Sequence, residues 1–125
     1  MKSIAFNSNC DHAPLPFTTV IFHLAAELKM AGLPWHPHTG CFVWDPDRYI
    51  RAPSPFPERV YFILSVPRFV VLFGSIESIA EKLVWLPTWH QARLICRSMT
   101  IDDTIALPPA GQDLETLYRL ILTHL

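Results

Sequence analysis

The sequence predicts an α+β fold in which a small antiparallel sheet packs with four or five helices. Apolar residues recur at helical spacing in segments that begin near Thr18, Ser75, Thr88 and Asp113. Two apolar stretches, a hairpin over 41–52 and a strand over 59–65, lie close together in the chain with no crossover helix between them. Neighbouring strands of this kind pair antiparallel, so a doubly wound sheet is the weaker alternative.

The stretch from Arg59 to Gly74 is the most apolar part of the chain. Side chains on both faces of its first half are apolar, which predicts the central strand of the sheet over 59–65. Pro67 suits the first turn of a following helix, Ser65 or Val66 stands where an N-cap belongs, and Gly74 stands where a helix stops. We expect this whole stretch to be buried.

The hairpin is predicted from the turn Asp45-Pro46-Asp47, which has Asp and Pro where a type I turn favours them. Its strands are expected at 41–44 and 48–52, with Trp44 facing Tyr49. The proline-rich stretch 52–57 is expected to be extended and unpaired.

The helices have local start and stop signals. Thr18 is a candidate N-cap for a helix that Gly32 ends, and Ser75 for a helix that reaches about Val84 before Pro87. Thr88 and Gln91 have capping-box spacing, with Trp89 expected on the buried side of their helix. The last helix opens with acids near Asp113, pairs Glu115 with Arg119, and is expected to turn Leu125 inward. Residues 104–107 are ambiguous between a loop and a short strand.

Length and composition limit the class of protein. A chain of 125 residues forms a single domain over 1–125, in which residues 1–16 are expected to be a largely irregular arm. Only 17% of the residues are charged, no apolar run approaches the roughly 18 residues of a membrane helix, and the N-terminus lacks a signal-peptide pattern. The 3 cysteines, an odd number, do not suggest a disulfide framework. We therefore expect a cytoplasmic protein.

The predicted hairpin and strand are the best candidate for a binding surface, because aromatic rings stack on bases and guanidinium groups hold phosphates. Asp45 and Asp47 at the turn, together with a net charge of −1, argue against nucleic acid as the partner. Nucleic-acid binding is therefore an alternative that we do not favour. The candidate residues are Trp44, Arg48, Tyr49, Arg51, Arg59 and Tyr61.

One cluster has the residue types of a zinc site. His36, His38 and Cys41 lie within six positions, and the N-terminal Cys10 and His12 would complete four ligands if the arm folded back. The simpler interpretation makes Cys41 a buried strand residue and leaves the histidines on a surface loop. We favour that interpretation and expect no cofactor.

Catalytic machinery is not evident in the sequence. No cysteine is favoured as a nucleophile by a neighbouring motif, and the 4 glycines form no phosphate-binding loop. We lean away from an enzyme and expect a protein that acts by binding or self-association, with a protein partner that the sequence does not identify. The sparse charge and wide apolar stripes favour a two-fold homodimer, with Leu120, Leu122 and Tyr118 as candidate contacts. Alternatively, the segments 33–37 and 52–57 cover the core within one chain.

Overall fold

The computed structural model describes residues 17–103 and 112–125. In these residues the chain forms five α-helices, a short 3-10 helix and three strands. The strands form one antiparallel sheet in the order β2-β1-β3. The α+β prediction is therefore confirmed. In chain order, the elements are α1 (Thr19–Met30), β1 (Phe42–Trp44), η1 (Pro57–Arg59), β2 (Val60–Phe62), α2 (Val66–Phe73), α3 (Ile76–Lys82), β3 (Val84–Leu86), α4 (Trp89–Ser98) and α5 (Asp113–Thr123).

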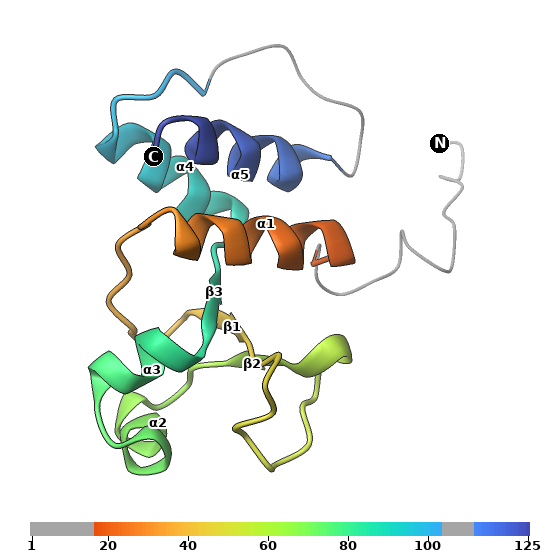
Figure 1. Ribbon diagram of the computed structural model, residues 1–125, viewed down its shortest axis with the longest axis vertical. Coiled ribbons are helices and arrows are strands. Elements are labelled where there is room, and N and C mark those ends of the chain that lie inside the picture. The colour runs from red at the N-terminus through yellow and green to blue at the C-terminus, as the bar shows by residue number, and fades with distance from the viewer. Residues whose placement is uncertain (1–16, 104–111) are drawn as a thin grey trace, which may run out of the picture.

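The sheet lies between two groups of helices, with α1, α4 and α5 on one side and α2 and α3 on the other (Figure 1). Alternate residues of each strand point to opposite faces, so the strand register divides their side chains between two cores. Trp44 pairs with Val60 and Val84 in the core beneath α1, α4 and α5. Val43 pairs with Tyr61 and Trp85, in the core that includes Phe73 and Ile79 from α2 and α3.

Four helices begin at the predicted capping residues. The side-chain oxygen of each cap accepts a hydrogen bond from the backbone N–H three residues later, which typically stabilises a helix by about 1 kcal/mol. The caps are Thr18, Ser65, Ser75 and Thr88, and the last forms the predicted capping box with Gln91. Gly74 ends α2 with a φ of 94°, a conformation that glycine adopts without strain.

The central strand of the sheet is β1, so the prediction that 59–65 holds the central strand was wrong. β2 pairs only with β1 among the described strands and lies at an edge. Both faces of β2 are apolar because helices cover the sheet from both sides. Apolar residues on both faces of a strand indicate that other layers cover the sheet above and below. They do not indicate whether the strand is at the centre or at the edge of the sheet.

The predicted hairpin over 41–52 does not form. β1 pairs instead with β2 and β3, and residues 48–52 are not a strand. The carboxylate of Asp45 accepts hydrogen bonds from the backbone N–H groups of Tyr49 and Ile50, which a paired strand would use in its ladder. Trp44 therefore stacks on Phe22 of α1, with ring centroids 5.0 Å apart, and does not face Tyr49.

The strand β3 replaces the last turn of a predicted helix. α3 ends at Lys82, and the β-branched and aromatic residues that follow adopt the extended conformation that Pro87 favours before it. Trp89 and Leu125, expected to face inward, are 49% and 40% exposed. The predictions for residues 1–16 and 104–107 fall outside the described residues. None of the described helices is both long and apolar enough to span a membrane.

Candidate binding surfaces

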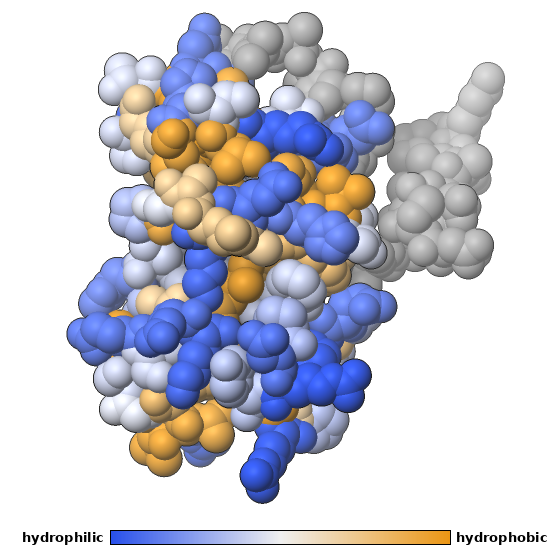
Figure 2. Space-filling model, in the orientation of Figure 1, coloured by the Kyte–Doolittle hydropathy of each residue, from blue (hydrophilic) through white to orange (hydrophobic). Residues whose placement is uncertain are grey.

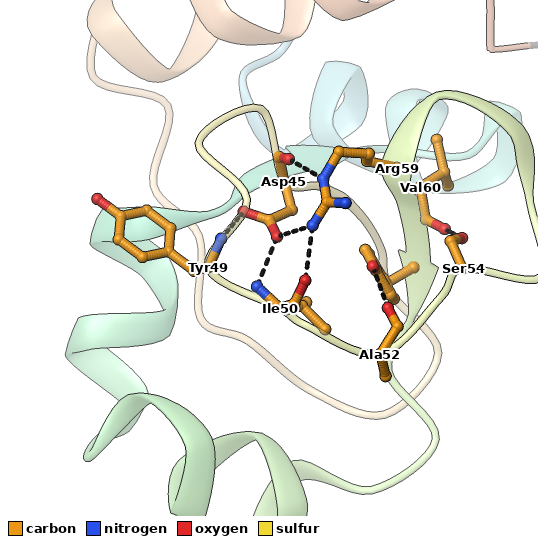
Figure 3. Close-up of polar contacts among 8 residues, drawn as sticks. Asp45, Tyr49, Ile50, Ala52, Ser54, Arg59 and Val60 are labelled. Carbon is orange, nitrogen blue, oxygen red and sulfur yellow. Dashed lines mark hydrogen bonds and ion pairs between the residues drawn. The ribbon is translucent and has the colours of Figure 1, made fainter.

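The loop between β1 and β2 is organised by one buried carboxylate, that of Asp45 (Figure 3). It accepts hydrogen bonds from the backbone N–H groups of Tyr49 at 3.0 Å and Ile50 at 2.8 Å. The guanidinium of Arg59 donates to the same carboxylate at 3.0 Å, to the Asp45 carbonyl at 3.0 Å and to the Ile50 carbonyl at 2.6 Å. These bonds close residues 45–59 into one unit.

The guanidinium of Arg59 therefore has its hydrogen-bond partners within the same chain. Its backbone and that of Glu58 both lie in the left-handed region, with φ of 61° and 59°. That conformation costs a residue with a side chain roughly 1–2 kcal/mol, and the guanidinium bonds across the loop offset this cost. A guanidinium in this position is not free to bind a phosphate.

Two more of the six candidate binding residues also have structural partners. Tyr61 is 7% exposed, and its hydroxyl donates to the carbonyl of Ala52 at 2.6 Å. Trp44 is half-buried on Phe22. The structure leaves Arg48, Tyr49 and Arg51 exposed, so it does not gather the six residues into one accessible face.

The structure brings together two of the three predicted zinc ligands. Nδ1 of His38 donates to the carbonyl of Thr39 at 2.9 Å, which leaves Nε2 to accept from the Cys41 thiol at 3.4 Å. Among residues 17–103 and 112–125, no group of three histidine, cysteine or acidic side chains converges, so His36 does not complete a site. Cys10 and His12 lie outside the described residues.

The contact between Cys41 and His38 resembles a nucleophile beside a base, but Cys41 has no exposed surface. A substrate cannot reach that sulfur without opening the core between the sheet and the helices α2 and α3. Cys41 packs there with Val43 and Ile63. We therefore interpret the thiol as a packing group that donates a hydrogen bond to a surface histidine.

The apolar surface of α2 is exposed. Phe69 and Phe73 face the core, while Leu64, Val71 and Leu72 are 76%, 87% and 53% exposed. The prediction that 59–74 is buried throughout was therefore wrong for these three residues. Figure 2 shows an orange patch at the lower end of the molecule, where α2 lies in Figure 1. We call Val71 and Leu72, together with Leu64 just before the helix, the α2 face.

The contacts predicted on α5 are less accessible than the α2 face. Tyr118 has no exposed surface, and its hydroxyl donates to the carbonyl of Pro87, so it cannot contact a second chain. Leu120 and Leu122 are half-buried and pack against the core formed with α1 and α4. Much of their surface is thus already buried within one chain.

A pocket of about 130 Å³ opens between α1, the segment after it, α3 and β3. Two stacked indoles form part of its wall, with ring centroids 6.0 Å apart and planes 8° from parallel. Both indole nitrogens are buried, and neither has a hydrogen-bond partner among the described residues. The lining residues are Ala25, Lys29, Leu33, Trp35, Ala80 and Trp85.

Lys29 connects this pocket to the end of α3. Its ammonium donates to the carbonyl of Glu81 and, at 3.1 Å, to that of Leu83. Partial burial lowers the pKa of Lys29, and the nearby negative charges of Glu81 and Asp47 oppose that shift. The ammonium therefore serves as a cap for the C-terminal end of α3.

Searches with this chain found no matching family model, no similar curated protein and no similar solved structure. Sequence reasoning missed the pocket because its residues come from four separate segments. The segment Val84-Trp85-Leu86, which is rich in strand-forming residues and precedes a proline, was the available signal for β3. Nothing local in the sequence indicates that Trp35 stacks on Trp85.

Proposed function

We propose that this protein acts by binding and that it self-associates through the α2 face. The observation that carries the proposal is the exposure of Val71 and Leu72 on α2 and of Leu64 just before it, with Arg68 as the only charge on α2. Soluble proteins seldom leave such a surface open unless it binds something. A second copy of the chain presents the same apolar face, and two-fold pairing covers both faces together.

The size of the α2 face indicates how strong this association is. Complete burial of an aliphatic side chain contributes about 1.5–3 kcal/mol, so three partly exposed side chains from each copy contribute roughly 6–12 kcal/mol. Association costs about 4–15 kcal/mol in lost motion. The net gain is therefore at most about 8 kcal/mol, which corresponds to a Kd no tighter than about 1 µM, and we expect a reversible dimer with a Kd between about 1 µM and 1 mM.

Light scattering over a range of protein concentrations tests the proposal. We expect the mass to rise from 14.3 kDa toward twice that value as the concentration rises. Val71→Glu should keep the protein monomeric without changing its fold. Met30→Glu is the matched control, because Met30 is 89% exposed at the end of α1, outside the α2 face.

Leu122→Glu tests the alternative interface on α5. Disruption of the dimer by this change, but not by Val71→Glu, would move the interface to α5. A mass of 14.3 kDa at every concentration up to about 1 mM would exclude self-association at the expected strength.

A further inference from the structure

The two stacked indoles of the pocket each have an N–H donor without a hydrogen-bond partner among the described residues. The Nε1–H groups of Trp35 and Trp85 are buried donors without a described acceptor. A buried donor left unpaired costs about 1–3 kcal/mol, and an indole has no acceptor atom with which to satisfy its neighbour. Because both tryptophans line the pocket, a ligand that brings an acceptor there can satisfy a donor that the described residues leave unpaired.

The shape of the pocket favours a flat, apolar ligand body. Ala25, Leu33 and Ala80 provide small or aliphatic walls beside the indole rings. Apolar cavities of about 150 Å³ take up benzene, so a pocket of about 130 Å³ suits a single aromatic ring whose substituent reaches the opening. A ring stacked against an indole also gains roughly 0.5–1.5 kcal/mol beyond the area that it buries.

The charges around the pocket favour a neutral ligand. Lys29 lines the pocket and its ammonium repels a cation, while the negative charges of Glu81 and Asp47, which act on Lys29, offset its attraction for an anion. Two described carbonyls accept from the ammonium, which has a third proton to donate. A neutral acceptor can therefore bond both to an indole N–H and to Lys29 without adding a charge.

We propose that the pocket lined by Trp35, Trp85 and Lys29 binds a small, neutral, planar aromatic molecule that carries a carbonyl-type acceptor. The ring lies against the apolar walls, and the carbonyl oxygen accepts from the pocket donors. Protein atoms cover both indole nitrogens in the structure, so the acceptor bonds first to Lys29, which lines the pocket, and reaches an indole N–H only when that half-buried ring rotates. This site shares no residue with the α2 face, and its test is independent of self-association.

Three probes with the same ring and different charge test the proposal. Benzamide is neutral and has a carbonyl oxygen, benzoate is an anion, and benzylamine is a cation without an acceptor. The ¹H–¹⁵N spectrum resolves the side-chain N–H signals of the 4 tryptophans, and single Trp→Phe variants assign them. We expect benzamide to shift the signals of Trp35 and Trp85, with a Kd on the order of 1 mM, and to leave that of Trp89 in place.

Benzoate and benzylamine should shift the two pocket signals at least several-fold less at equal concentration. Ala80→Leu fills the pocket from α3 while keeping both indoles, and it should abolish the benzamide shifts. Val71→Glu on the α2 face should leave them unchanged. Shifts by benzylamine equal to those by benzamide, no benzamide shift up to about 10 mM, or shifts that persist in Ala80→Leu would each overturn the proposal.

Discussion

Arg59 and Asp45 form an ion pair at 3.0 Å in which the carboxylate has no exposed surface and the guanidinium side chain is 30% exposed. The pair joins the end of β1 to the start of β2, across a loop of proline-rich sequence. Because the carboxylate also accepts two backbone N–H groups, it replaces the hydrogen bonds of the hairpin that does not form. The conformation of the loop is thus held by the side chains of Asp45 and Arg59.

We expect Asp45→Ala to lower the free energy of unfolding by about 3–5 kcal/mol, because it leaves two amides without an acceptor and the guanidinium without its carboxylate. Arg59→Ala should cost less, about 2–4 kcal/mol, because part of that side chain is already in water. Urea unfolding measures both. Arg51→Ala, an exposed arginine of the same loop, is the control and should change stability by less than about 0.5 kcal/mol. A loss below about 1 kcal/mol for Asp45→Ala would contradict this account of the loop.

This ion pair also illustrates what the sequence could not predict. Thr18, Ser65, Ser75 and Thr88 were identifiable as caps because each bonds to an amide only three residues away. A capping signal therefore lies within four positions of the chain. Asp45 and Arg59 are fourteen positions apart, and no local or periodic pattern in the sequence indicates that they pair.

The strands were harder to predict than the helices for a related reason. β1, β2 and β3 have three residues each, too few for an alternating pattern to be distinguished from a short apolar run. Tyr61 and Trp85 each lie in a short apolar run of the sequence. Only the strand register shows that they lie on either side of Val43. For the same reason the pocket, which needs Trp85 of β3 beside Trp35 and Lys29, could not be predicted from local patterns.

Tyr118 predicts how stability changes in alkaline solution. Burial raises the pKa of its hydroxyl well above 10.0. Below pH 10 both the folded and the unfolded chain keep the phenolic proton. Above it the unfolded chain loses the proton while the folded chain retains it, so the free energy of unfolding should fall by up to about 1.4 kcal/mol per pH unit.

Urea unfolding between neutral pH and pH 11 measures this effect. Tyr118→Phe should be less stable at neutral pH by about 1–3 kcal/mol, because the carbonyl of Pro87 loses its donor. Its stability should then decline less steeply above pH 10. Tyr49→Phe is the control, since Tyr49 is 44% exposed and should not alter the slope. Equal alkaline slopes in Tyr118→Phe and the unchanged protein would contradict burial as the cause.

Nucleic-acid binding makes a distinct prediction for the remaining exposed arginines. With Arg59 bound to Asp45, only Arg48 and Arg51 of the three candidate arginines are free to contact phosphates, and two such contacts give weak binding. We therefore expect no binding of single-stranded RNA or DNA at micromolar protein and low salt, measured by fluorescence anisotropy. Micromolar, salt-sensitive binding that Arg48→Ala and Arg51→Ala each weaken would favour the nucleic-acid alternative instead.

The contact between His38 and Cys41 makes the last prediction, which concerns zinc. Structural zinc sites use four ligands, and the described residues bring together only these two. We therefore expect protein purified without a histidine tag to carry no near-stoichiometric zinc. In a Cys10→Ser background we also expect Cys41 and Cys96, which have no exposed surface, to react with a thiol reagent only when the protein unfolds.

Elemental analysis and thiol titration measure these two properties separately. Zinc that His38→Ala removes and His36→Ala retains would show that the pair of His38 and Cys41 holds a metal, with its other ligands from outside the described residues. In that case Cys10→Ser and His12→Ala should each release the zinc as well. Rapid reaction of Cys41 in the folded protein would contradict its role as a packing group, because a thiolate must be accessible to react.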